Sequence, residues 1–215
     1  MIVLGFHTAG PACELALIRD GEPLAVRTEA MQRGQDARLP GLTQALLSDA
    51  GVALDEVDRF AVVTGPGSFT GIRVGVAFAR GLALATEKTC LGITTLEAAL
   101  PAGQQGSAIV VLPAQKRPPD ITYWAQTFRS GTPTDAATEM SLSAIAELLT
   151  SHPHMVYGDA DALRTEIPDL TVHAAQPTAV RAAQLAAELT PEDRPARPTY
   201  ARAPDAALPK TSAPL

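Results

Sequence analysis

The sequence TGPGSFTGIRVG, residues 64–75, is the most informative stretch of the chain. A short apolar strand, 60–63, runs into it, and a helical pattern follows from about Thr70 to Thr86. A strand, a glycine-rich turn and a helix start can together hold an anion, because free backbone N–H groups converge there. The stretch contains no lysine, whereas a phosphate-binding P-loop has Gly-Lys-Ser/Thr at the start of its helix. A phosphate cradle is therefore the weaker of two interpretations.

The helix that follows the turn gives the stronger interpretation. Between Gly71 and Ala85 the only charged residues are Arg73 and Arg80, which lie seven positions apart and therefore share one face. A helix that is apolar on almost every other side is expected to be buried on almost every side. It is too short, and too interrupted by arginine, to span a bilayer.

Small residues form an unbroken row along this helix. The row repeats every four residues and consists of Gly71, Gly75, Ala79 and Ala83. Each glycine costs about 1 kcal/mol of helix stability relative to alanine, so the close contact that it permits must contribute more than that. Either the row packs against the chain's own sheet, or one face of the helix meets that sheet and another face meets a second subunit.

Under the second hypothesis the turn and the helix form a partner interface. The residues predicted for it are Gly65, Pro66, Gly67, Ser68, Phe69, Thr70, Gly71, Arg73, Gly75, Val76, Ala79, Arg80 and Ala83. Arg73 and Arg80 would then pair with carboxylates, or with a nucleotide phosphate held between subunits, since arginine forms strong charge-assisted hydrogen bonds. The alternative for both arginines is a solvated stripe.

Composition restricts the class of protein. The 215 residues suit one large domain or two small lobes with an ample core. With 17 basic and 23 acidic residues the formal net charge is −6, which does not indicate a stand-alone nucleic-acid binder. The two cysteines, Cys13 and Cys90, lie in apolar surroundings and are expected to be reduced core residues. The sequence shows neither a signal peptide nor a membrane helix, so we expect a cytoplasmic protein without membrane contact.

The first half of the chain is predicted to form a βββαβα unit. Apolar runs bounded by turns predict strands at 2–6, 13–18, 24–28, 60–63 and 90–93. A helical pattern from Leu39 ends near Gly51, where a C-terminal glycine belongs. Thr94, with Glu97 three residues later, has the spacing of a capping box and predicts the start of another helix.

The second half of the chain has weaker signals. Residues 101–106 contain proline and glycine and mark the predicted boundary between two lobes. Strands are predicted at 108–112, 121–128, 155–158 and 170–173, with helices at 142–150 and 178–189. The predicted organisation is an N-terminal lobe at 1–103, a reduced C-terminal lobe at 104–190, and a proline-rich tail at 191–215 that is mostly extended or disordered.

Two features of the sequence carry a family resemblance. The βββαβα order is similar to the duplicated lobe of the ribonuclease-H-like fold of actin, Hsp70 and sugar kinases, an α/β fold of two lobes with a mixed first sheet. The turn and helix start at 65–75 closely resemble the signature of the TsaB family, a bacterial subunit of the machinery that makes threonylcarbamoyladenosine in tRNA. Further similar segments are Thr8-Ala9, Leu82-Ala83-Leu84, Gly92–Glu97, Tyr123-Trp124-Ala125 and Pro198–Arg202. The resemblance covers most of the first half well and the second half thinly.

The resemblance implies a non-catalytic subunit with no catalytic residue, metal or cofactor of its own. In that family the first-lobe helices pair the subunit with a copy of itself or with the catalytic subunit, TsaD. TsaD carries the metal and transfers the threonylcarbamoyl group to N6 of the adenosine next to the anticodon. A small ATPase, TsaE, joins the assembly, and tRNA is reached only through the complex.

The sequence departs from the family pattern at three places. Active members of the ATPase fold end the first strand with an aspartate that holds the Mg²⁺ shell, but His7 stands here. Neutral imidazole is a poor ligand for Mg²⁺, which prefers oxygen, so His7 is interpreted as a plain strand-end residue. Gln35-Asp36 lacks the histidine usual in the family, and 114–117 replaces a usual Asp-Ala-Arg. These losses weaken the case for nucleotide or metal binding and leave the helix interface untouched.

Two kinds of enzyme are the alternatives. One is a small ATP-dependent phosphotransferase or hydrolase of the same fold, which His7 at the metal position disfavours. The other is a peptidase, but the sequence has no recognisable pair of nucleophile and base. Ser68 lacks the Gly-x-Ser-x-Gly elbow of a hydrolase nucleophile and is better interpreted as part of the helix N-cap.

Overall fold

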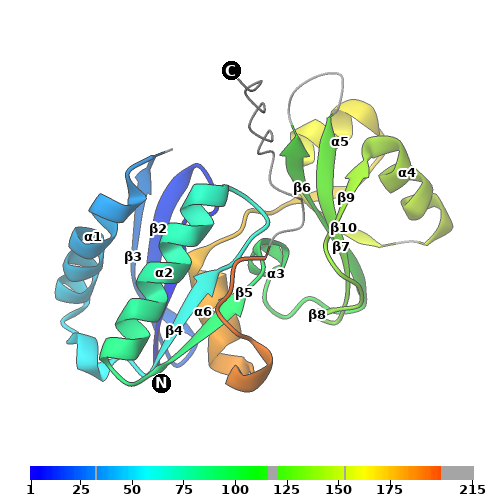
Figure 1. Ribbon diagram of the computed structural model, residues 1–215. Coiled ribbons are helices and arrows are strands. Elements are labelled where there is room, and N and C mark those ends of the chain that lie inside the picture. The colour runs from blue at the N-terminus through cyan, green and yellow to red at the C-terminus, as the bar shows by residue number, and fades with distance from the viewer. Residues whose placement is uncertain (32, 116–120, 153, 200–215) are drawn as a thin grey trace, which may run out of the picture.

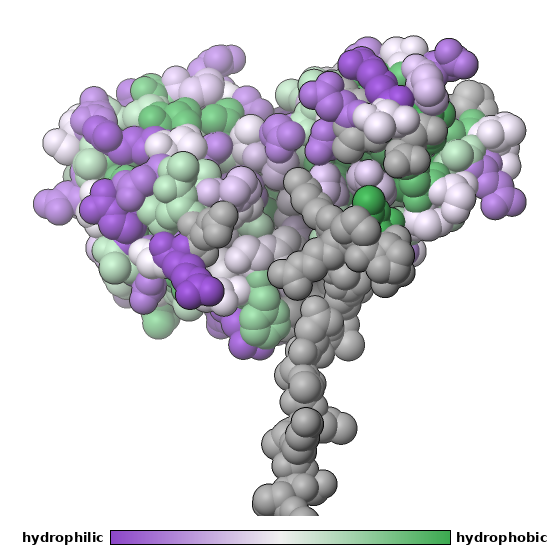
Figure 2. All heavy atoms as spheres, turned by 90° about the horizontal axis from the view of Figure 1, so that it is seen from above, coloured by the Kyte–Doolittle hydropathy of each residue, from purple (hydrophilic) through white to green (hydrophobic). Residues whose placement is uncertain are grey.

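The chain folds into two lobes, each built on one β-sheet with helices against it (Figure 1). The computed structural model describes residues 1–31, 33–115, 121–152 and 154–199. Seen from above, both lobes mix hydrophilic and hydrophobic residues over their surfaces (Figure 2). No helix within these ranges is both long enough and apolar enough to cross a membrane. The predicted α/β fold of two lobes is confirmed.

The first lobe contains a five-stranded mixed sheet in the order β3-β2-β1-β4-β5. Its strands are β1 (Ile2–His7), β2 (Ala12–Arg19), β3 (Glu22–Ala30), β4 (Arg59–Val63) and β5 (Thr89–Ile93). The first three pair antiparallel, as their tight turns require, and β4 and β5 continue from β1 in parallel. This confirms the predicted order of strands in the first half.

Helices cover both faces of the first sheet. The helices α1 (Gln35–Ala50) and α2 (Phe69–Ala85) lie on one face, and α6 (Ala179–Glu188) lies on the other (Figure 1). A short 3-10 helix, η1 (Leu54–Glu56), leads from α1 into β4. The predicted glycine stop is confirmed, because Gly51 ends α1 in the left-handed conformation at φ 62°.

The second lobe repeats the strand order of the first with shorter helices and shorter edge strands. Its sheet runs β11-β10-β6-β7-β8, with β9 also paired to β7, so β6 has the central place that β1 has in the first sheet. The elements are β6 (Ser107–Gln115), β7 (Thr122–Arg129), β8 (Thr132–Pro133), β9 (Thr138–Ser141), α4 (Leu142–Ser151), β10 (Met155–Gly158), α5 (Ala160–Glu166) and β11 (Val172–Ala174). The prediction missed β8, β9 and α5, because elements this short show no clear period.

Each lobe is covered by a helix from the other half of the chain. The helix α3 (Thr95–Ala99), which begins with the predicted capping box, packs Leu96 into the core of the second lobe. In exchange, α6 places Ala183 in the core of the first lobe. The fit there is close, since a Cβ added at Gly5 of β1 would lie 2.4 Å from the carbonyl oxygen of Ala179. The two helices also contact each other and join the lobes.

This exchange corrects the predicted C-terminal lobe at 104–190. By sequence α6 follows the second sheet, but its alanines fit the crowded surface over β1 and belong to the first core. A helix with larger side chains in place of these alanines could not approach β1 so closely, because the space over Gly5 is already filled by Ala179 and Ala183. The loop that the sequence predicts at 116–120 lies outside the described residues.

The start of the predicted tail is ordered against the first lobe. A short 3-10 helix, η2 (Pro191–Asp193), is followed by a bridge between Pro195 and Leu91 of β5. Ala196 is buried. Residues 191–199 of the predicted tail are therefore ordered against the first lobe, with little regular secondary structure, and the remainder of the tail lies outside the described residues.

The small-residue row of α2 packs inside the chain. A Cβ added at Gly71 would lie 2.0 Å from the carbonyl oxygen of Thr8, and one added at Gly75 would lie 2.2 Å from the Thr8 hydroxyl. That hydroxyl donates a buried hydrogen bond of 2.7 Å to the carbonyl oxygen of Gly71. Ala79 and Ala83 continue the buried row. The row therefore serves the chain's own packing, as the first of the two hypotheses states.

We expect Gly71→Ala to lower the free energy of unfolding by about 2 kcal/mol, because its methyl group would overlap a backbone oxygen that cannot easily move. The matched control is Gly81→Ala in the same helix, where no atom lies within 4 Å of the added Cβ. That variant is expected to raise stability by about 0.5–1 kcal/mol through its better helix propensity. Urea unfolding measures both, and equal stabilities would contradict the prediction.

Candidate partner-binding surface

The turn before α2 is held by hydrogen bonds to two neighbouring segments. At the start of α3, the Thr95 N–H donates to the Gly65 carbonyl oxygen at 2.9 Å. The Thr95 hydroxyl donates to the Pro66 carbonyl oxygen at 2.6 Å. On the other side the Ser68 N–H donates to the Ala9 carbonyl oxygen at 2.7 Å. The turn is thus a braced support for the first residues of α2.

This bracing removes support for a phosphate cradle. The Ser68 N–H is already engaged, and the Gly71 N–H donates to the Ser68 hydroxyl at 3.2 Å, which confirms the predicted N-cap. The backbone of Gly67 lies close to Ala9, where an added Cβ would be 2.4 Å from the carbonyl oxygen. The glycines of the turn therefore permit close backbone contact within the chain.

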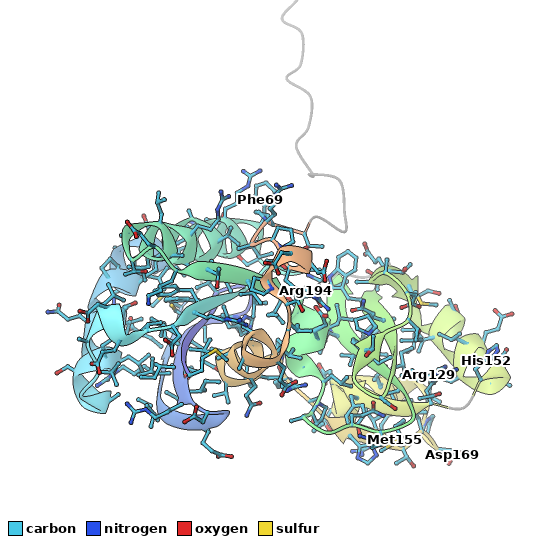
Figure 3. All side chains as sticks on the ribbon, turned by 90° about the horizontal axis from the view of Figure 1, so that it is seen from below. Phe69, Arg129, His152, Met155, Asp169 and Arg194 are labelled. Carbon is cyan, nitrogen blue, oxygen red and sulfur yellow. The ribbon has the colours of Figure 1, made fainter. Side chains whose placement is uncertain are left out.

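The outer face of α2 is exposed along the length of the helix. Its exposed residues are Phe69, Thr70, Arg73, Ala77, Arg80, Gly81, Leu84 and Ala85, and we call this set the α2 outer face. Phe69 is 43% exposed and Leu84 is 83% exposed, although both are large apolar side chains. Figure 3 shows Phe69 on the outer side of the helix. The Arg73 guanidinium lies 3.7 Å from the centre of the Phe69 ring and covers part of it.

Small residues occupy the middle of the α2 outer face. Ala77 and Gly81 lie one turn apart, and a Cβ built at Gly81 has no neighbouring atom within 4 Å. On the adjacent helix α1, Gly41 is equally open. Because the distance between packed helices depends on the side chains at their contact, such residues let a helix from another chain approach closely.

The structure divides the predicted interface residues into two groups. Gly65, Pro66, Gly71, Gly75, Val76, Ala79 and Ala83 are buried within the chain, so they lie out of a partner's reach. Gly67, Phe69, Thr70, Arg73 and Arg80 are exposed, and Ser68 is half-buried. The prediction is corrected for the buried group, because Thr8 lies against Gly71 and Gly75 of the small-residue row, while Ile72 and Thr199 lie against Gly65.

Sequence reasoning missed four residues of the α2 outer face, which are Ala77, Gly81, Leu84 and Ala85. Ala77 follows Arg73 by four positions, and Leu84 follows Arg80 by the same distance. Positions four apart fall on one helix face, so the spacing of the arginines already contained the signal. Gly81 lies one turn after Ala77 and completes the stripe.

Comparison with known proteins assigns the chain to a family. The family described as TsaD: tRNA N6-adenosine threonylcarbamoyltransferase matches residues 26–190, which is more than half of the chain. The chain belongs to the TsaD family. It is 36% identical over 127 residues to the tRNA threonylcarbamoyladenosine biosynthesis protein TsaB of Escherichia coli (strain K12), a match that covers 59% of this chain and 54% of that protein. The predicted resemblance to TsaB is confirmed, and the match spans about half the length of that relative.

Solved structures support the fold. A crystal structure of an uncharacterized protein with similarity to peptidase YEAZ from Pseudomonas aeruginosa superposes with a TM-score of 0.71 at 24% identity, covering 94% of this chain and 99% of that one. The activator of the 2-hydroxyisocaproyl-CoA dehydratase from Clostridium difficile, solved with bound ADPNP, has a TM-score of 0.53 at 11% identity, covering 87% and 95%. At these identities both likenesses concern the fold alone.

For active members of the ATPase fold that the sequence resembles, a metal site is expected at the end of β1, and the residues of this chain do not fit one. His7 stands where the fold's aspartate would hold the metal, and only 6% of it is exposed. Burial lowers its pKa to about 4, so the imidazole is neutral at physiological pH. Its Nδ1 has no hydrogen-bond partner within the described ranges. In the same ranges no three His, Cys, Asp or Glu side chains gather where they could hold a metal.

Both cysteines are free thiols, as the sequence predicts. Burial raises the pKa of Cys13 to about 11, with a smaller contribution from the negative charge of Glu29. Burial also raises the pKa of Cys90 to about 12, although the positive charge of Arg80 acts against it. Because the thiolate is the reactive form, neither residue is an activated nucleophile at neutral pH.

We expect the chain to lose stability below about pH 6.5 because of His7. Its pKa is about 4 in the folded chain against 6.5 for an unperturbed histidine, so only the unfolded state takes up a proton in that range. This contribution is complete above the unfolded pKa and is lost as the pH falls toward the folded pKa, by up to about 3 kcal/mol.

The measurement is the free energy of urea unfolding at several pH values for the wild type and for His7→Gln. Glutamine does not titrate, so the variant should keep only the acid dependence of the other titratable groups, among them the carboxylates and His154, whose pKa burial also lowers. The wild type should therefore lose more stability than the variant on acidification. Parallel curves for the two proteins would show that His7 has an ordinary pKa in the folded chain.

Proposed function

We propose that the chain is a non-catalytic subunit of a tRNA threonylcarbamoyladenosine assembly. In this proposal it binds the threonylcarbamoyl transferase subunit, or a second copy of itself when alone, through the α2 outer face. A small ATPase and tRNA contact it only within the complex, and it works in the cytoplasm. The match to TsaB of Escherichia coli and the membership of the TsaD family support the process, and the geometry of α2 supports the role.

The observation that carries the proposal is the exposure of α2 on one side only. Its inner row is fixed against Thr8, while Leu84 and Phe69 on the outer side remain in solvent. The exposed apolar residues of this face, Phe69, Ala77, Gly81 and Leu84, follow one another along the helix, and a continuous apolar surface of this kind suits a contact with another protein. Arginine is common at such interfaces, and Arg73 and Arg80 favour a partner surface that carries carboxylates.

The chain's own residues give little support to the enzyme alternatives. His7 is buried and neutral, so it does not supply the oxygen ligand that Mg²⁺ prefers. The Ser68 hydroxyl caps α2 by accepting from Gly71 and is occupied in that role. A partner-binding role needs only the residues that are already exposed on the α2 outer face.

Gly81→Leu is expected to weaken binding to the transferase about tenfold or more, because a large side chain would hold the two surfaces apart. The chain itself should stay folded, since no atom lies within 4 Å of the added Cβ. Isothermal titration with the purified transferase of the same organism measures the affinity. Gly81→Ala is the matched control and should bind nearly as the wild type. If Gly81→Leu also binds normally, the α2 outer face is not the interface.

Arg73→Glu is expected to weaken the same complex, and the loss should shrink as the salt concentration rises, since salt screens exposed charges. The matched control is Arg129→Glu at the exposed end of β7 in the second lobe, which makes the same change of charge away from α2. Titration at low and at high salt compares the two variants. Equal losses for both would mean that net charge matters and not the position of Arg73.

A further inference from the structure

The segment Arg194–Thr199, which we call the strap, has no role in the function proposed above. It lies along the edge of β5, where the Gly92 N–H donates to the Arg194 carbonyl oxygen at 2.9 Å. Pro195 forms an antiparallel bridge with Leu91. An unpaired edge strand exposes backbone hydrogen-bonding groups, so the strap satisfies part of this edge of the sheet.

The far end of the strap reaches the turn before α2. The Thr199 N–H donates to the Thr64 carbonyl oxygen at 2.8 Å, and the hydroxyls of the two residues lie 3.2 Å apart within hydrogen-bond distance. The Thr199 carbonyl oxygen is so close to Gly65 that an added Cβ there would be 2.9 Å away. Between the two ends, Ala196 is buried in the core of the first lobe. The strap is therefore packed against the turn as well as hydrogen-bonded to it.

An ion pair fixes the near end of the strap. Arg194 contacts the Glu97 carboxylate at 2.6 Å, and the Glu97 side chain is only 4% exposed. The other carboxylate oxygen accepts from the N–H of Thr94 at 2.9 Å and from its hydroxyl at 2.7 Å. Removing one partner of such a pair leaves a buried charge without compensation. Figure 3 places Arg194 near the junction of the lobes, away from Phe69 on the outer side of α2.

The ion pair and the turn are connected through α3. Glu97 caps the helix whose first residue, Thr95, holds the carbonyl oxygens of Gly65 and Pro66. The strap thus holds the turn directly at Thr199 and indirectly through Glu97. Both routes converge on the residues that immediately precede α2.

We propose that the strap positions the turn before α2, and with it the first residues of the α2 outer face, for partner binding. The proposal rests on the proposed function, because the partner is the transferase that binds this face. Docking of the strap and binding of the partner are then coupled, so loosening the strap weakens the complex although no strap residue needs to touch the partner.

The test uses the full-length chain with Arg194→Gln, which removes the charge opposite Glu97. The matched control is Arg197→Gln, since Arg197 is an exposed arginine of the same strap. Amide hydrogen exchange of the free chain should become about tenfold faster at Ser68 and Thr95 in Arg194→Gln and stay unchanged in β6 and β7. Titration with the purified transferase should show about tenfold weaker binding, and Arg197→Gln should match the wild type in both measurements.

Three results would overturn the proposal. One is faster exchange confined to the strap, another is faster exchange at the turn with unchanged affinity, and the third is equal loss of affinity in the control. Arg194→Lys keeps the charge, so its exchange rates at the turn and its affinity for the transferase should lie close to those of the wild type. If Arg194→Gln fails to fold, Arg194→Lys is compared with the wild type in its place.

The exchange measurement needs no partner, so it tests the coupling of strap and turn by itself. If Gly81→Leu binds as the wild type, the proposed face is wrong whatever the exchange shows. If Gly81→Leu weakens binding and Arg194→Gln does not, only the role of the strap is wrong. The two failures are therefore distinguishable.

Discussion

The contact between α2 and Thr8 is the constraint on which the first lobe depends. Two glycines one turn apart bring the helix backbone against the residue that follows β1, at distances where no Cβ would fit. Glycine weakens a helix by about 1 kcal/mol relative to alanine, so the contact must contribute more than two such losses. Part of the gain is the buried hydrogen bond from the Thr8 hydroxyl to the Gly71 carbonyl oxygen. Without this contact the buried hydroxyl would lose its partner, which costs free energy.

Fixing the inner row of α2 also fixes its outer row. A helix held at Gly71 and Gly75 cannot rotate about its axis without breaking the contact with Thr8, so Arg73, Ala77 and Gly81 keep one orientation toward solvent. A surface that is already ordered loses less conformational freedom on binding than a mobile one. Gly71 and Gly75, for which the sequence predicts a place in a partner interface, therefore do not contact the partner. They fix the orientation of the exposed residues on the opposite side of the helix.

The local features of this fold could be predicted from the sequence, whereas the contacts between distant segments could not. The strands of the first half, the capping box at Thr94 and the glycine stop at Gly51 follow from nearby residues, and each is confirmed. Helical periodicity also separated the faces of α2 but could not say which face points inward, because that depends on Thr8, far away in the chain. The exchange of α3 and α6 between lobes was hidden for the same reason, since an alanine-rich pattern shows a small face without showing which sheet it fits.

The contacts between α3 and α6 limit the relative motion of the two lobes. Just before α6, the Thr178 N–H donates to the Ala98 carbonyl oxygen of α3 at 3.2 Å, and Arg181 of α6 donates from Nε to the Leu100 carbonyl oxygen at 3.1 Å. These directional bonds add to the crossing of α3 and α6, so a relative motion of the lobes would have to break several contacts together. A stiff junction, a strap tied to the turn and an exposed helix face are properties that suit a positioning subunit, since each limits how much the bound surface can move.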